Sequence, residues 1–289
     1  MSTSFRIALL LALAGVAHAA PPYVVSSRTS NAIADIWEYD LYRVEGGHRT
    51  RLTERAGPEG EPAVDAHGEL LAFVAPVDGH FQLFTMPLAG GALTQRTNGP
   101  AEAGHPSFDP SGEKLVLPLT QADGHFGLAL LDLTSNATRT LVAGAYHCWS
   151  PEWSPDGRRI AFVSDRDGQA GIYLFHVESG GVERLTSTDV SERDPHWSPD
   201  GARLAFSRRL SRDRADVWVA DVARGTRAPV VQGAGLNLQP CFTPDGASLL
   251  FTSNRGGSFN IWQLVLATGA VSACDPGPHS DQNARALWH

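Results

Sequence analysis

The sequence repeats one motif five times, at a nearly constant spacing of 44 or 45 residues. Three copies keep the turn sequence Ser/Thr-Pro-Asp-Gly followed by a β-branched and aromatic run, and two upstream copies have lost part of that turn. The copies begin at Pro62, Pro106, Pro151, Pro195 and Pro240. A period near 45 residues, with several short strands in each copy, is typical of the blades of a β-propeller.

The best preserved copy, residues 150–173, predicts three short strands joined by two turns. Pro155-Asp156-Gly157 forms the first turn, because proline fixes φ at the first central position and glycine accepts a positive φ. The run from Ile160 to Ser164 and the run from Ile172 to Phe175 are rich in residues that favour strands. We therefore expect an all-β, six-bladed β-propeller of four-stranded antiparallel blades, formed as a single domain by residues 20–289.

The two ends of the chain are predicted to complete one blade together. Residues 23–53 match the second, third and fourth strands of a blade but lack an innermost strand. The segment 286–288 supplies a candidate for that strand, with Trp288 in the register of Trp197. Pairing the tail with the head closes the ring and removes the sheet edges that invite aggregation.

Residues 1–19 are predicted to be a signal peptide rather than part of the fold. Arg6 precedes a short apolar run, Ile7 to Ala17, and Ala17-His18-Ala19 has the pattern of a cleavage site. The apolar run is too short to span a bilayer. We expect an exported protein without membrane insertion, and the net charge of −8 disfavours binding to nucleic acid.

The three cysteines are an odd number for an exported protein. Cys241 is expected on an innermost strand, Cys274 on an outermost strand of the same blade, and Cys148 two blades earlier. These positions suggest no close pair, so the thiols are interpreted as small buried apolar groups, with a disulfide as the less favoured alternative.

The repeat predicts which residues surround the mouth of the central channel. Successive turns of an antiparallel blade lie at opposite ends, so the residues that enter the innermost strands share one face, which we call the mouth face. The opposite face, which holds the Ser-Pro-Asp-Gly turns, is called the turn face. Binding residues are commonly loop residues held by a rigid scaffold. The predicted binding ring consists of the residue that precedes the first residue of each repeat copy: Glu61, His105, Ser150, Asp194, Gln239 and Arg285. Trp149, next to Ser150, is added to this predicted site.

The repeat resembles that of TolB-type periplasmic proteins. The shared features are Trp-Ser-Pro-Asp-Gly, then Ile/Leu-Ala-Phe, then Ser-Asp-Arg or Ser-Asn-Arg, then Ile-Tyr or Ile-Trp. TolB proteins carry an additional N-terminal α/β domain, and this sequence is predicted to contain only the propeller. The resemblance implies a periplasmic, monomeric binding module for an envelope protein, peptide or other ligand. The repeat is also similar to propellers of prolyl-peptidase-like hydrolases and oligogalacturonate lyases.

The sequence has no Gly-x-Ser-x-Gly elbow, phosphate loop, Cys-x-x-Cys or His-Glu-x-x-His motif. The histidines suggest an alternative, because His105, His147 and His196 lie near the starts of three consecutive innermost strands. Together with nearby acidic residues they could hold a divalent metal, as in the metal-dependent oligogalacturonate lyases. The three positions do not share a register within the repeat, which favours structural roles.

Two further groups have alternative interpretations. Asp165-Arg166 and Asn254-Arg255 are expected to close turns and bridge blades rather than contact a ligand. Trp149 and Tyr146 could form an exposed aromatic platform or could pack against the fold. The sequence therefore favours a non-enzymatic propeller that binds a protein or ligand at the channel mouth, and the alternative is a metal-dependent lyase or carbohydrate-processing enzyme.

Overall fold

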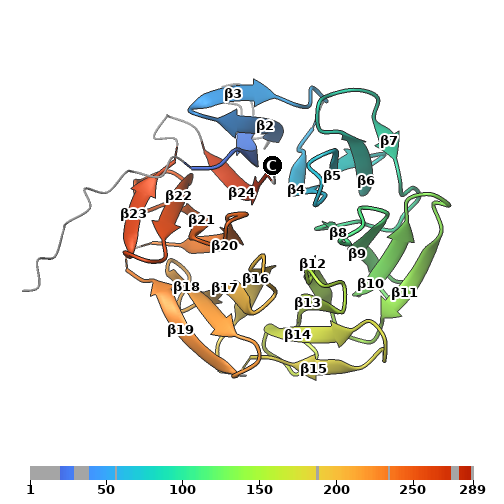
Figure 1. Ribbon diagram of the computed structural model, residues 1–289. Helices are drawn as coiled ribbons and strands as arrows, with labels where there is room; N and C mark the ends of the chain where they lie inside the picture. The colour runs from blue at the N-terminus through green and yellow to red at the C-terminus, as the bar shows by residue number, and fades with distance from the viewer. Residues whose placement is uncertain are drawn as a thin grey trace, which may run out of the picture.

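The computed structural model describes residues 20–28, 39–55, 57–186, 189–233, 235–274 and 280–287. These residues form six four-stranded antiparallel sheets arranged as a ring, as Figure 1 shows in a view along the channel. The predicted signal peptide, residues 1–19, lies outside the described residues. No helix long and apolar enough to cross a bilayer occurs within the ranges given above.

The strands follow the chain in order, and only the first blade mixes the two ends. Blade one consists of β24 (Asp281–Ala286), β1 (Tyr23–Arg28), β2 (Tyr39–Glu45) and β3 (His48–Arg51). Blade two consists of β4 (Gly60–Val64), β5 (Leu70–Val77), β6 (His80–Pro87) and β7 (Thr94–Gln95). Blade three consists of β8 (Ser107–Phe108), β9 (Lys114–Thr120), β10 (Phe126–Asp132) and β11 (Thr138–Val142).

The remaining three blades have the same pattern. Blade four consists of β12 (Cys148–Trp153), β13 (Arg159–Ser164), β14 (Gly171–His176) and β15 (Val182–Arg184). Blade five consists of β16 (Glu192–Trp197), β17 (Arg203–Arg209), β18 (Ala215–Asp221) and β19 (Thr226–Val231). Blade six consists of β20 (Asn237–Phe242), β21 (Ser248–Ser253), β22 (Asn260–Val265) and β23 (Ala270–Ala273).

Ring closure by the C-terminal strand is confirmed, but the predicted register was wrong by two residues. β24 pairs with β1 and sets Tyr23 opposite Ala286, as Trp197 is set opposite Leu204 in blade five. Ala286, and not Trp288, therefore occupies the position equivalent to Trp197, and Trp288 itself lies outside the described residues. By the same register, Asn283 and not Arg285 corresponds to Asp194.

The Ser-Pro-Asp-Gly turns are stabilised by the side chain at their first position. In blade four the Ser154 hydroxyl accepts the Arg159 amide at 2.9 Å and donates to Asp156 at 2.6 Å. The degraded copies begin this turn with aspartate instead, and Asp65 accepts two backbone amides at 2.7 and 2.9 Å. An oxygen acceptor at the first position is thus enough to close the turn after Pro-Asp is lost. The turns retain glycine with φ near +70°, for example Gly157 at +69°.

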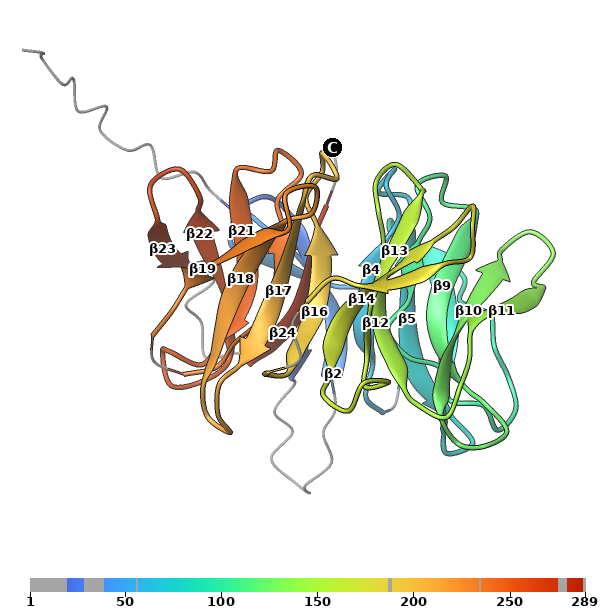
Figure 2. The same ribbon diagram turned by 90° about the horizontal axis from the view of Figure 1, so that it is seen from below.

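The core lies between neighbouring blades, because each sheet must bury both faces. One cluster joins Ile172 of blade four to Trp197 and Phe206 of blade five, and the other junctions have equivalent clusters. Such stacked sheets exclude water from both surfaces, and large aromatic side chains fill the widening space between them. Figure 2, the view turned by 90°, shows the sheets standing around the channel with their turns at the two ends.

Candidate functional site

The predicted ring position has a distinctive backbone conformation. Five of its residues have positive φ although none is glycine: Glu61 at 55°, Ser150 at 46°, Asp194 at 54°, Gln239 at 52° and Asn283 at 55°. In all five of these blades the ladder between the two innermost strands also shifts register at this point. Such a bulge bends the strand and redirects the side chain toward the channel. A left-handed conformation costs about 1–2 kcal/mol in a non-glycine residue, so its recurrence requires compensation.

Three of these ring side chains form a belt by accepting hydrogen bonds from backbone amides of the next blade. Glu61 Oε2 accepts the His105 amide at 2.6 Å, and Asp194 Oδ2 accepts the Gln239 amide at 3.3 Å. Gln239 Oε1 in turn accepts the Asn283 amide at 3.2 Å. Ring side chains in blades two, five and six therefore hold neighbouring innermost strands together. Sequence reasoning missed this structural role, because the repeat pattern shows the position but not its bonds.

The structure brings most predicted site residues together around a narrow channel. A cavity of only about 20 Å³ is lined by five of them: His105, Ser150, Asp194, Gln239 and Arg285. Glu61 lies beside this constriction and pairs with His105 at 2.9 Å. Trp149 is apart from it, half-buried, with the Arg193 guanidinium 5.5 Å from its ring centroid. Trp149 and Tyr146 have different partners and so do not form the joint aromatic platform considered above. Tyr146 packs against Arg166 and donates to the Ala143 carbonyl.

Arg285 occupies the channel rather than the ring position. Its Nε donates to the Pro62 carbonyl at 3.2 Å, which links the closing strand β24 to blade two. It lines both the constriction and a wider cavity of about 250 Å³ that extends toward the turn face. The wider cavity also contains Glu152, His196 and Cys241. The channel is therefore narrow at the mouth face and wide at the turn face.

Glu61 and His105 form a charge pair beside the constriction. Burial alone favours the neutral form of each side chain, but their mutual attraction and hydrogen bonds outweigh it. As a result the pKa of Glu61 is lowered and the pKa of His105 is raised. The charged pair adds a second connection between blades two and three beside the amide bond already described.

His196 is a neutral side chain of the channel wall. Burial and the charge of Arg285 lower its pKa to about 3. Its Nδ1 accepts the Phe242 amide at 3.3 Å, so the proton resides on Nε2, which faces Cys241 Sγ at 3.3 Å and Glu152 Oε1 at 3.4 Å. Burial also raises the pKa of the Cys241 thiol and of Glu152. Because Nε2 already carries a proton, it cannot accept the proton of the Cys241 thiol. This cluster therefore lacks the base that a nucleophilic cysteine needs.

The three histidines suggested as metal ligands have separate surroundings. His105 pairs with Glu61, His196 contacts Cys241, and His147 accepts the Phe126 amide at 3.2 Å through Nδ1. Among the described residues no group of three or more histidine, cysteine, aspartate or glutamate side chains is placed to hold a metal ion. This geometry does not favour the metal-dependent alternative.

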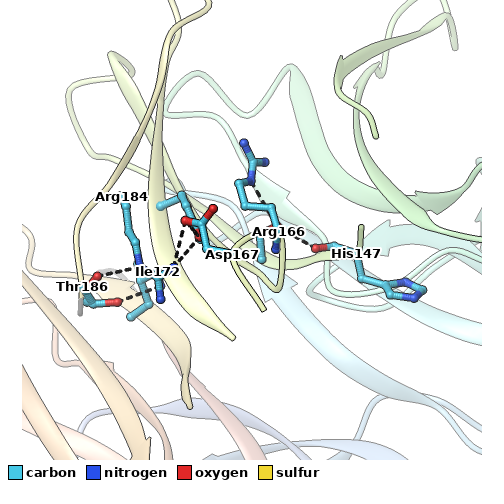
Figure 3. Close-up of polar contacts among 8 residues, drawn as sticks. His147, Arg166, Asp167, Ile172, Arg184 and Thr186 are labelled. Carbon is cyan, nitrogen blue, oxygen red and sulfur yellow. Dashed lines mark hydrogen bonds and ion pairs between the residues drawn. The ribbon is translucent and has the colours of Figure 1, made fainter. Parts of the chain in front are cut away.

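The carbonyls of Asp165 and Asn254 close turns by accepting the Gly168 and Gly257 amides, as expected. Asp165 accepts the His147 amide at 2.8 Å, and Asn254 accepts the Leu236 amide at 2.7 Å. The contacts of Arg166 and Arg255 lie within their own blades, so the expected arginine bridge between blades was wrong. Arg166 donates to the Ser164 hydroxyl and stacks on Tyr173. Figure 3 shows Arg166 between His147 and Asp167. Cys148 and Cys241 are buried thiols on innermost strands, as predicted.

A groove on the mouth face was not predicted. A groove of about 630 Å³ crosses the junctions of blades one, two and three and reaches the ring at Glu61 and Asn283. Phe81 on its rim is 40% exposed. Three aromatic residues of the groove, Tyr39, Phe81 and Phe126, share one repeat register, opposite Arg28, Pro76 and Thr120 on the preceding strand. This recurring aromatic position is a signal in the sequence that the prediction of the binding ring left unused.

The fully buried Glu59 lines this groove and has an unusual carboxylate. Burial raises the pKa of Glu59 to about 7, and the neighbouring Thr53 and Arg55 offset this shift only in part. Arg55 Nε lies 4.0 Å from Glu59 Oε1, beyond hydrogen-bond distance. A carboxylate that is buried without a close cation carries a substantial desolvation cost.

Comparison with known proteins agrees with this architecture. The family model described as TolB beta propeller domain matches residues 94–211 and 190–287. The structure of TolB from Acinetobacter baumannii superposes with a TM-score of 0.81 at 18% identity, covering 93% of this chain and 67% of that chain. A TolB candidate from Agrobacterium tumefaciens gives 0.64 at 26% identity, covering 73% and 81%.

A more distant fold relative is an oligogalacturonate lyase in complex with manganese, with a TM-score of 0.60 at 16% identity over 83% of this chain and 71% of that chain. No curated protein sequence matches this chain. The family match covers more than half of the chain, and the six sheets and the closing strand agree with it. The chain belongs to the TolB β-propeller family.

Proposed function

We propose that this protein is an exported, monomeric propeller that binds an envelope protein or peptide at its mouth face. The observation that carries the proposal is the continuity of two hollows on that face. The groove of about 630 Å³ meets the channel constriction at Asn283, which lines both. A ligand that lies in the groove would therefore be next to the polar rim of the channel.

Three further features support a binding role. Membership of the TolB family is consistent with protein binding in the periplasm, and the apolar segment before Ala17-His18-Ala19 fits export by a signal peptide. The protonated His196 Nε2 and the separated histidines argue against a nucleophilic or metal-dependent reaction. The ring residues are held by hydrogen bonds between blades, which makes the mouth a rigid frame for recognition.

The test is partner capture by matched surface variants. Trp149→Ala combined with Arg193→Ala alters the mouth face, and Arg158→Ala combined with Glu113→Ala alters exposed side chains of the turn face. Immobilised wild-type protein and both variants are presented with periplasmic extract, and captured proteins are quantified by mass spectrometry. We expect the mouth-face variant to lose partners that the turn-face variant retains, with equal melting temperatures. Equal capture by both variants would contradict the proposal.

A further inference from the structure

The groove beside the channel mouth has an unusual chemical character. Its lining includes three acidic residues, Glu59, Glu61 and Glu102, and no lysine, arginine or histidine lines it among the described residues. Aromatic side chains also line it: Tyr39, Phe81 and Phe126. Acidic groups next to aromatic faces are the usual surroundings of bound organic cations, which gain from charge attraction and from the aromatic quadrupole.

Two buried polar groups of this groove have no hydrogen bond within 3.5 Å: the hydroxyl of Ser26, which is 2% exposed, and both carboxylate oxygens of Glu59, which is 0% exposed. The Thr53 hydroxyl and Arg55 Nε lie near the Glu59 carboxylate and offset its desolvation only in part. An unpartnered buried hydroxyl or carboxylate costs roughly 1–3 kcal/mol or more, so such groups call for an explanation. Both accept hydrogen bonds, and a ligand that supplies several donors would satisfy them together.

Two histidines near the groove pair with Glu61 and Glu102, whereas Arg55 is only partly engaged, because its Nε has no hydrogen-bond partner and lies 4.0 Å from Glu59 Oε1. Arg55 stacks over the Phe84 ring at 4.3 Å and donates to the Pro76 carbonyl at 3.4 Å. His80 pairs with Glu102 at 3.0 Å, and His105 pairs with Glu61 at 2.9 Å. Glu59 is therefore the one acidic residue of the groove lining without a cationic partner within 3.5 Å.

We propose that this groove binds an ammonium or guanidinium group, with Glu59 and Ser26 as its hydrogen-bond acceptors and the aromatic residues against its aliphatic stem. The inference rests on the proposed function, because it names the chemistry that the mouth face recognises. A carboxylate or phosphate ligand would meet three acidic residues with no lining cation, and an apolar ligand would leave both buried acceptors unpartnered. The overall charge of −8 also favours the approach of a cationic partner.

The test compares probes that differ only in charge. Isothermal titration calorimetry measures binding of acetyl-Gly-Gly-Lys-Gly-Gly-amide and of the same peptide with norleucine in place of lysine. Cadaverine serves as a small free amine. We expect the lysine peptide to bind at least tenfold more tightly than the norleucine peptide. Weak cadaverine binding would indicate a peptide-borne cation, and cadaverine binding equal to that of the peptide would indicate a free amine; both support a cation site.

Variants of the groove then separate binding from folding. Glu59→Gln removes the ionisable carboxyl group at nearly constant volume, so we expect at least tenfold weaker lysine-peptide binding with unchanged or higher thermal stability. A purely structural glutamate would instead show lower stability and unchanged binding. Glu113→Gln, an exposed glutamate of the turn face, is the matched control. Phe81→Ala, compared with Leu93→Ala at the same 40% exposure, tests the aromatic contact in case Glu59→Gln fails to fold.

Equal binding of the lysine and norleucine peptides, or no binding of any probe, would overturn the cation site. The capture experiment is independent of this outcome. If mouth-face variants lose partners while the lysine peptide does not bind, the binding module stands and only its cation chemistry fails.

Discussion

Arg49 and Asp281 form a two-point ion pair across 232 residues of sequence, with N–O distances of 2.7 and 2.9 Å. Arg49 lies on β3, the outermost strand of blade one, and Asp281 begins β24, the innermost strand of the same blade. The Asp281 side chain is fully buried and the Arg49 side chain is 14% exposed. This pair therefore ties the tail of the chain to its head, in addition to the β24–β1 ladder.

Asp281→Ala should destabilise the ring by about 3 kcal/mol, because it breaks a largely buried two-point ion pair. Urea denaturation of the full chain measures the change. The control is Glu45→Ala, which breaks an exposed pair with Arg43 in the same blade and should cost less than about 1 kcal/mol. Similar effects of the two substitutions would show that the buried pair does not hold the closure.

The ring position gives a second prediction, at Asp194. Asp194→Ala removes the acceptor of the Ser207 hydroxyl and one of the two acceptors of the Gln239 amide, and it places alanine at φ +54°, so it should cost about 2–4 kcal/mol. Asp194→Asn keeps an acceptor oxygen and tolerates positive φ, so most of the stability should return. Asp194→Gly removes the strain of the positive φ but does not restore the hydrogen bonds. Its unfolding free energy should therefore lie between those of Asp194→Ala and Asp194→Asn. If all three variants melt together, the belt contributes nothing.

His196 predicts a loss of stability in acid. Its folded-state pKa is about 3 and its unfolded value is about 6.5, so below pH 6.5 the unfolded chain binds a proton that the folded chain refuses. Stability from this group is complete above pH 6.5 and falls as the pH decreases toward 3, by about 2 kcal/mol at pH 5. Unfolding free energies of wild type and His196→Gln at pH 7 and pH 5 provide the measurement. The acid-dependent loss should be smaller in the variant, and an identical loss would rule out this role.

The fold was predictable because the constraint on it is periodic. The spacing of Pro62, Pro106, Pro151, Pro195 and Pro240 fixes the blade count, and the missing innermost strand at the N-terminus points to the tail. The register of the closing strand was not predictable in the same way. The position of the closing strand that is equivalent to Trp197 holds Ala286 and not an aromatic residue. Aligning Trp288 with Trp197 therefore placed the strand two residues out of register.

The binding surface was predictable only in part. The repeat identifies the ring, and five of its predicted residues meet at the constriction. Hydrogen bonds such as that from the Gln239 amide to Asp194 depend on a bulge and on the neighbouring blade, which a repeat pattern does not contain. The groove depends on Tyr39, Phe81 and Phe126, which share one register of the repeat, but their common hollow forms only after blades one, two and three assemble.

The central claim, that ligands bind at the mouth face, is tested most directly by site-specific photo-crosslinking in cells that express the protein. A benzophenone amino acid replaces Phe81 at the groove rim or Leu93 on the turn face, two positions with the same 40% exposure. We predict that irradiation gives a discrete crosslinked adduct from position 81 and none from position 93. Adducts from position 93 alone, or equally from both positions, would contradict the account.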